Sequence, residues 1–126
     1  MSKSTKNSET TIPLSHSDFH ILLALANTQL HGYAIMQQVT EWTGGSIRMG
    51  PGTLYGAIKR MLSSGLVEEV PEGERPEDAS ERRRYYRLTN HGDKIVLAET
   101  NRLASLVKVA QSKKLPVTVQ FVEGAI

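Results

Sequence analysis

The 126-residue sequence contains no cysteine, and aromatic residues make up only 6% of it. The absence of cysteine excludes disulfide bonds, thiolate metal sites and thiol nucleophiles. Long apolar runs are also missing: the longest, ILLALA at residues 21–26, is far shorter than the roughly 20 residues that cross a bilayer, and no apolar signal region begins the chain. We therefore expect a soluble, cytoplasmic protein without a membrane span.

The chain also lacks a large excess of charge: it has 15 Lys and Arg residues and 13 Asp and Glu residues, which gives a formal net charge of +2. An anionic partner must then be met by a local basic patch rather than by bulk charge. The length and the 39% hydrophobic content suffice for one domain with a modest core.

The first half of the chain has the patterns of a tail and two helices. Residues 1–13 are polar and unpatterned, so we expect a disordered tail. Ser15 and Asp18 resemble a capping box, and apolar residues at helical spacing follow up to Ala26. Gly32 permits a turn into a second helix that runs toward Trp42.

A third helix is expected after Pro51, with Thr53 as its cap. Apolar residues at helical spacing give this helix a stripe that can be buried, made of Leu54, Ala57, Ile58, Met61 and Leu62. Tyr55, Lys59 and Arg60 point elsewhere, so the helix has a second face with another use.

The second half of the sequence predicts a hairpin and a long helix. Gly65 suits a left-handed helix end, and the segments 66–70 and 82–88 have the composition of two paired strands with a long mobile tip between them. Thr89 then caps a helix over residues 90–115. The tail, residues 116–126, alternates like a strand but has no evident place.

Two short helices joined by a tight connection and followed by a β-hairpin describe a winged helix-turn-helix. The expected fold class is mainly α with a small β-hairpin: a winged helix-turn-helix DNA-binding domain over residues 14–89 and a long C-terminal dimerisation helix over residues 90–115. The free face of the third helix can then enter the major groove of DNA, which is about 12 Å wide.

Candidate DNA contacts lie on the second and third helices and on the arginine run of the hairpin. Guanidinium groups bind phosphate bidentately, and a tyrosine near a helix N-terminus can donate its hydroxyl to phosphate. The alternatives are a merely solvated arginine run and tyrosines that belong to the core. The predicted contacts are Tyr33, Thr53, Tyr55, Lys59, Arg60, Arg82, Arg83 and Arg84.

Three ordered motifs resemble the PadR-type transcriptional regulators of prokaryotes. LHGYAIMQQV is similar to the family's His-Gly-Tyr segment, GPGTLYGAIKRMLSSGLVEE resembles its Gly-Thr-Leu-Tyr recognition helix, and RRRYYRLTNHGDKIV resembles its Tyr-Arg-Leu-Thr-x-x-Gly junction. The resemblance covers about residues 18–110 and implies a dimeric winged-helix regulator, usually a repressor, whose last helix builds the dimer interface. Gly56 departs from the family, where a proline is common, and the short C-terminus is typical of compact members.

The last helix carries an apolar stripe that extends beyond the reach of three small helices. Self-pairing through a two-fold axis is the commonest way to cover such a stripe. A homodimer of this kind is expected to bind double-stranded DNA as an inverted repeat. The predicted interface residues are Ile95, Leu103, Leu106, Val107 and Ala110.

Other chemistries have little support, so we expect no enzyme, no cofactor and no metal site. Pro51 follows the glycines where a phosphate-binding P-loop needs lysine. His16 and His20 have the spacing of metal ligands on a helix, but no third ligand accompanies them. No Ser, His and Asp set has the order of a catalytic triad.

Some alternatives stay open. The chain could be a winged-helix module for protein association without DNA binding, or a small metal-dependent enzyme that uses His16 and His20. A small-molecule effector is left open, although the last helix lacks the aromatic residues that line such sites in compact relatives. We expect Trp42 to pack in the core or at a pocket edge. The operator, the regulated genes and the direction of regulation do not follow from the sequence.

Overall fold

The computed structural model describes residues 12–79 and 82–121, so nearly all of the expected N-terminal tail lies outside the described residues. The described part consists of helices with a small three-stranded sheet at one edge, and the mainly helical, winged fold class is confirmed. The elements are, in chain order, α1 (His16–Ala24), β1 (Leu30–His31), α2 (Gly32–Trp42), α3 (Pro51–Ser63), β2 (Val67–Glu69), the 3-10 helix η2 (Glu72–Glu74), β3 (Tyr85–Leu88) and α4 (Asn90–Ser112).

Two of the three expected helix caps are present. Ser15 Oγ accepts a hydrogen bond of 3.1 Å from the Asp18 backbone N–H at the start of α1, and Thr89 Oγ1 accepts one of 3.0 Å from Gly92 at the start of α4. The expectation that Thr53 caps α3 is wrong, since that helix begins earlier, with Gly50 as its cap residue. Pro51 occupies the first helical position, where its fixed φ is already helical and its missing N–H costs nothing.

The core lies between α1, α2 and α3, and α4 closes it from the other side. Its residues include Ile21, Leu22, Ile35, Val39, Leu54, Ile58, Met61 and Val96. Leu62, expected in the buried stripe of α3, is 40% exposed, and Trp42, expected in the core or at a pocket edge, is 49% exposed at the end of α2 and so is not a core residue. Both stand at the edge of an amphipathic stripe, where helical spacing alone does not decide burial.

The expected hairpin has a third strand. β3 is central in an antiparallel sheet of order β1-β3-β2, with Leu30 opposite Tyr86 and Val67 opposite Leu88. The two-residue strand β1 is too short to show a periodicity of two in the sequence. It fixes the residues that lead into α2 against the base of the wing.

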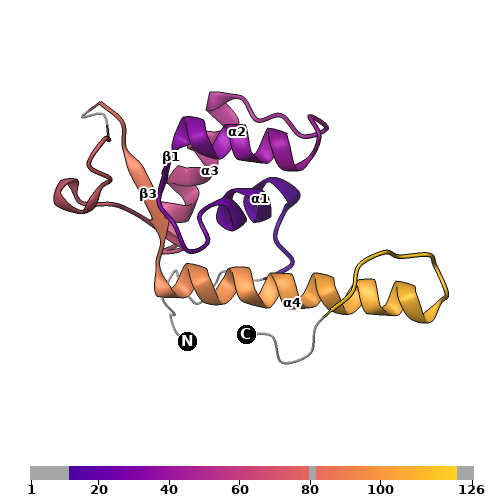
Figure 1. The fold of residues 1–126 in the computed structure, drawn as a ribbon. Helices are drawn as coiled ribbons and strands as arrows, with labels where there is room; N and C mark the ends of the chain where they lie inside the picture. Colours follow the sequence, from indigo (N-terminus) through magenta and orange to yellow (C-terminus); the bar gives the residue numbers. More distant parts are fainter. Residues whose placement is uncertain (1–11, 80–81, 122–126) are drawn as a thin grey trace.

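The three short helices gather over one half of α4, while the other half of α4 projects beyond them (Figure 1). The junction between sheet and α4 is tight: the Thr89 backbone N–H donates to the Leu66 carbonyl at 3.0 Å. A Cβ on Gly92 would collide with the same carbonyl oxygen, so α4 can lie this close to β2 only with glycine there. Across the described residues, none of the helices is long and apolar enough to cross a membrane.

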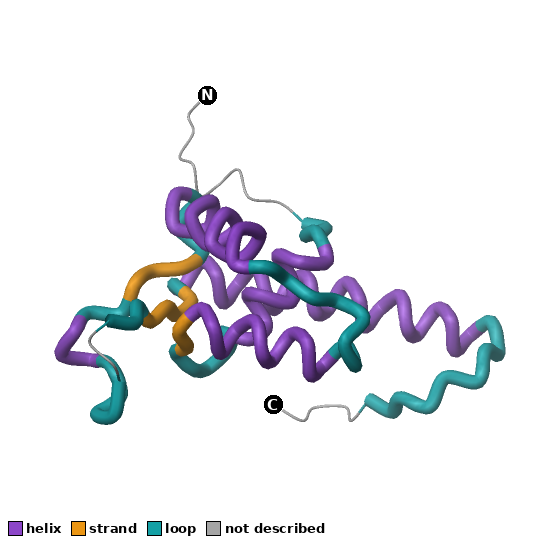
Figure 2. The backbone as a smooth tube through the Cα atoms, turned by 90° about the horizontal axis from the view of Figure 1, so that it is seen from above, coloured by secondary structure: helices purple, strands orange, loops and turns teal. Residues whose placement is uncertain are grey.

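After α4 the chain turns back along the helix, as seen from above in Figure 2. Lys114 adopts a positive φ of 66°, and Gln111 Nε2 then donates to the Val119 carbonyl at 2.8 Å. Lys108 Nζ lies 5.4 Å from the centre of the Phe121 ring. Within the described part, residues 116–121 form no strand, because they pair with helix side chains rather than with another extended segment.

Candidate nucleic-acid interface

The helix α3 has the two faces that its sequence predicts. Leu54, Ala57, Ile58 and Met61 are buried against α1 and α2. On the opposite side lie exposed residues that can meet a partner: Gly52, Thr53, Tyr55, Gly56, Lys59 and Arg60. A Cβ on Gly52 or Gly56 would meet nothing within 4 Å, so the backbone of this face is open to close approach.

Two tyrosines of the predicted set meet at the start of α2. Tyr33 is 55% exposed and Tyr55 is 46% exposed, so neither is a core residue. The Tyr55 hydroxyl lies directly against Gly32, where a Cβ would collide with it. The absence of a side chain at residue 32 therefore brings the outer face of α3 and the N-terminus of α2 together.

The arginine run of the wing lies beside these tyrosines. Arg82, Arg83 and Arg84, together with Tyr33 and Tyr55, line a cavity of about 250 Å³. The structure thus joins five of the eight predicted DNA-binding residues into one basic, hydroxyl-rich surface. We call this surface, with His31 included, the tyrosine–arginine cleft.

His31 is a member of the tyrosine–arginine cleft that the sequence prediction missed as a contact. Its Nδ1 accepts a hydrogen bond of 3.2 Å from the Ala34 backbone N–H, which caps α2, and its Nε2 lies 2.7 Å from Arg83 Nη1. The ring packs edge-on against Tyr85 with 5.3 Å between centroids. The sequence signal for this contact is the position of His31 directly before Gly32, the glycine that begins α2.

Burial of the His31 ring, and after it the charge of Arg83, lower the pKa of His31 below its ordinary value of 6.5. The imidazole is therefore neutral at pH 7, and a neutral imidazole has one nitrogen that accepts and one that donates. The ring cannot accept hydrogen bonds from Ala34 and Arg83 at the same time.

Ion pairs give the wing its shape. Arg75 is only 14% exposed as a side chain and donates to the Val70 carbonyl at 3.0 Å and to the Glu69 carboxylate at 3.2 Å. Arg87 joins Glu68 at 2.7 Å and Glu74 at 2.9 Å. The described part of the expected tip, residues 71–79, thus contains η2 and is tied to the ends of β2 and β3 by these contacts.

Lys59 and Arg60 lie apart from the cleft, and only one of them reaches another element. Arg60 Nη2 lies 3.1 Å from Asp18 Oδ1 of α1, although the Arg60 side chain remains 65% exposed. This ion pair directs Arg60 toward α1. Lys59 and Thr53 stay on the exposed outer face.

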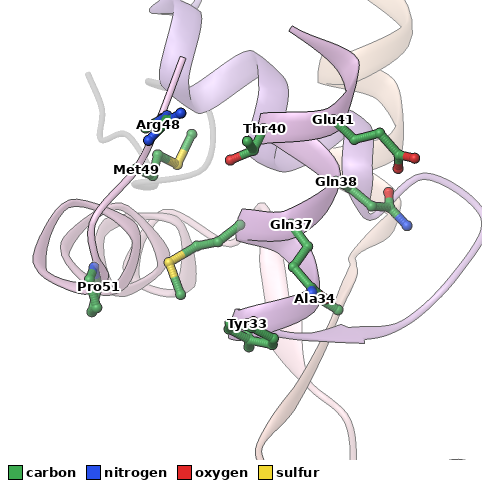
Figure 3. Close-up of a pocket in the computed structure, with 10 residues that line it drawn as sticks. Tyr33, Ala34, Gln37, Gln38, Thr40, Glu41, Arg48, Met49 and Pro51 are labelled. Carbon is green, nitrogen blue, oxygen red and sulfur yellow. The ribbon is translucent and has the colours of Figure 1, made fainter. Parts of the chain in front are cut away.

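A second hollow, a groove of about 950 Å³, separates α2 from the segment that leads into α3. Figure 3 shows Tyr33, Gln37 and Glu41 on the α2 side and Arg48, Met49 and Pro51 on the other. Tyr33 lines both this groove and the tyrosine–arginine cleft, so the two adjoin at this side chain. Arg48 is an exposed cation on this surface that no motif in the sequence marked.

The predicted interface residues of α4 fall into two groups. Ile95 packs against the core of its own domain. Leu103, Val107 and Ala110 are partly exposed and Leu106 is 53% exposed, with Val109, 52% exposed, as a neighbour that the prediction did not include. Beyond Glu99 no described residue of α4 is buried, so this half of the helix has an open apolar face.

The two histidines of α1, His16 and His20, lie near each other. Their ring centroids are 6.3 Å apart, and His20 Nδ1 contacts the His16 carbonyl oxygen at 2.6 Å. Among the residues that the structure describes, no group of three or more His, Cys, Asp or Glu side chains could hold a metal ion.

Comparison with known proteins finds relatives of this chain in sequence and in fold. A curated relative, an uncharacterized 37.1 kDa protein in transposon TN4556 of Streptomyces fradiae, is 33% identical over 103 residues, which cover 82% of this chain and 27% of that protein. The chain thus spans about a quarter of that relative's length.

Two solved structures share the fold. A PadR family transcription regulator from Clostridium difficile is 29% identical with a TM-score of 0.64, over 80% of this chain and 100% of that one. A transcriptional regulator from Clostridium thermocellum is 26% identical with a TM-score of 0.58, over 75% and 89%. These relatives agree with the expectation of a regulator rather than an enzyme. The model of the transcriptional regulator PadR-like family matches residues 21–98, and the chain belongs to that family.

Proposed function

We propose that this protein is a sequence-specific DNA-binding transcriptional regulator that acts as a homodimer on an inverted-repeat operator. The observation that carries the proposal is the exposed outer face of α3 next to the tyrosine–arginine cleft. A helix face that can enter the major groove and a flanking set of guanidinium and hydroxyl donors are the two parts that sequence-specific binding requires.

The roles follow from the positions. Thr53 and Lys59 lie on the outer face of α3 and are our candidates for base contacts, with Arg60 beside them. Tyr33 and Tyr55 donate hydrogen bonds from their hydroxyls to backbone phosphates. The wing contacts the phosphate backbone through Arg82, Arg83 and Arg84.

The open half of α4 supports the dimer. Leu103, Leu106, Val107 and Ala110 recur at helical spacing and therefore share one side of the helix. Lys108, which contacts the returning tail, lies off this side, and Gln111, four residues after Val107, lies at its edge. We propose that Leu103, Leu106, Val107 and Ala110 pair with the same residues of a second copy. The recognition helices then lie about 34–36 Å apart, or a multiple of that distance.

Repression is the effect that we propose for such a dimer. A protein bound across a promoter sequence excludes other proteins from the same stretch of DNA. Transcription of a reporter gene behind the bound sequence, with and without the regulator, measures the direction of the effect.

The decisive experiment is selection of bound sequences from a random DNA pool, followed by titration at several salt concentrations. We expect an inverted repeat to be enriched and log K to fall with log salt by about 0.9 per phosphate contact. Failure to enrich any DNA, with a salt-insensitive association to protein instead, would favour a protein-association module.

A further inference from the structure

In the tyrosine–arginine cleft, two hydrogen-bond donors approach the ring of His31, and the ring cannot accept from both. The Ala34 backbone N–H and the Arg83 guanidinium are both donors, and they approach the two nitrogens of the same ring, at 3.2 Å and 2.7 Å. A neutral imidazole offers one acceptor and an imidazolium offers none. One of these contacts is therefore between two donors.

The position of the ring indicates which contact that is. His31 is the cap residue of α2, and Nδ1 is the nitrogen that accepts from the backbone of the first turn. Edge-on packing against Tyr85, at an interplanar angle of 88°, holds the ring in this orientation. With Nδ1 as acceptor the hydrogen is on Nε2, where it faces Arg83.

We propose that His31 and Arg83 together bind one phosphodiester oxygen of the DNA backbone, with the hydroxyls of Tyr33 and Tyr55 beside it. An anionic oxygen next to both groups accepts from His31 Nε2–H and from the guanidinium, while Nδ1 keeps its bond to Ala34. All donors of the arrangement are then satisfied. This assignment rests on the proposed DNA-binding function and adds His31 to its contacts.

The charges around the cleft favour such an anion. Arg82, Arg83 and Arg84 line it, and no Asp or Glu is among the described residues that do so. At the edge of the cleft, the Glu69 carboxylate lies 4.0 Å from Arg84 Nη1. Burial of the ring and the charge of Arg83 lower the pKa of His31 in the free protein, so at pH 7 the ring meets the phosphate as a neutral Nε2–H donor.

Two substitutions separate the phosphate contact from the helix cap. His31→Ser keeps a cap, since serine is among the preferred cap residues, but its side chain is too short to reach the cleft. His31→Ala removes both. We expect the thermal midpoint of His31→Ser to stay close to that of the wild type and that of His31→Ala to fall.

On the selected DNA both variants are expected to bind about tenfold more weakly, the size of one hydrogen bond to a charged group. In an Arg83→Ala background the loss from His31→Ser should shrink, because both residues serve one phosphate. Wild-type affinity in His31→Ser would overturn the inference and leave the proposed function standing. A wild-type protein that binds no DNA would overturn both.

Nitrogen NMR of the His31 ring gives a readout that does not depend on stability. We expect the Nε2 signal of the ring to shift when DNA is added while Nδ1 stays an unprotonated acceptor for Ala34, and a ring that keeps its free-state signals on DNA addition would contradict the assignment. Inorganic phosphate is the probe for a free anion: it should give the same change only at concentrations far above those of DNA. If inorganic phosphate saturated the site at a lower concentration than DNA does, the site would be assigned to a free anion. That result would overturn the proposed contact with the DNA backbone.

Discussion

The Tyr55 hydroxyl of α3 lies against Gly32, at the place that a side chain on residue 32 would occupy. This packing fixes the separation between the N-terminus of α2 and the outer face of α3. Because the obstructing atoms belong to the end of an exposed tyrosine, a methyl group at residue 32 would displace Tyr55 rather than the backbone.

We therefore expect Gly32→Ala to affect DNA binding more than folding. Its thermal midpoint should change little, because a helical alanine offsets some of the strain, while DNA affinity should fall by about 1 kcal/mol through loss of the Tyr55 phosphate contact. Fluorescence anisotropy with labelled DNA measures the loss. In a Tyr55→Ala background the same substitution should cost nothing further, and an equal loss there would show that Tyr55 is not the cause.

Lys59 and Arg60 are expected to contribute unequally to DNA binding. Lys59→Ala should cost about 1–3 kcal/mol and relax the preference at one base pair if Lys59 reads a base. Arg60→Ala should cost less, because Asp18 holds the guanidinium at 3.1 Å. Asp18→Asn is the matched control: it releases Arg60, should strengthen binding to all sequences, and should change the free energy of unfolding by less than about 1 kcal/mol. A larger loss from Arg60→Ala than from Lys59→Ala would contradict this order.

The wing is expected to supply affinity rather than sequence preference. Replacing Arg82, Arg83 and Arg84 together by alanine should reduce the salt slope by up to about three phosphate contacts, each worth about 0.9 on a log–log plot. The preferred sequence, determined by selection with the variant, should stay the same. A changed sequence at an unchanged slope would instead assign base contacts to the wing.

Assembly is expected to depend on the open half of α4. Leu103→Asp with Leu106→Asp should dissociate the dimer, because unpaired carboxylates in an apolar seam cost several kcal/mol. Light scattering reports the mass, and circular dichroism checks that the winged domain stays folded. A variant that remains dimeric, or a wild-type monomer at micromolar concentration, would place the interface elsewhere.

The last prediction concerns Glu99, which is 1% exposed and anchors the start of α1 to α4. Its carboxylate accepts from Arg102 at 2.7 Å and 2.9 Å and from the Leu14 backbone N–H at 3.0 Å. The Arg102 hydrogen bonds, joined by that of Leu14, lower the pKa of Glu99 below its ordinary value of 4.5 although burial opposes them.

A carboxyl group with a lowered pKa in the folded state stabilises the fold above its ordinary pKa and loses this contribution as the pH falls through the folded value. Stability to urea should therefore decline below about pH 4.5 in the wild type. Glu99→Gln should cost about 1.5–3 kcal/mol at pH 7 and flatten the decline. If the stability of the wild type and of Glu99→Gln fell in parallel as the pH was lowered, Glu99 would not be the source of the decline.

Much of this architecture follows from local patterns in the sequence. Helical spacing predicted α2 and the buried stripe of α3. Ser15 and Thr89 cap helices, and Gly65 follows α3 with a positive φ, as predicted, because each of these features depends on neighbouring residues in the chain. The regulator family followed from three motifs in order. These features depend on interactions within a few residues, which a sequence displays directly.

Other features were decided only by tertiary contacts. β1 exists because Leu30 and His31 meet β3, a partner more than fifty residues away in the chain, and two residues carry no pattern of their own. The sequence did not indicate an ion pair for Arg60, which forms because α1 places Asp18 next to it in the fold. The competition of Ala34 and Arg83 for one imidazole likewise joins a local cap to a distant wing. The sequence by itself determined which helices form and what each face contains, whereas only the folded chain decided which charges find partners, because pairing depends on the meeting of separate elements.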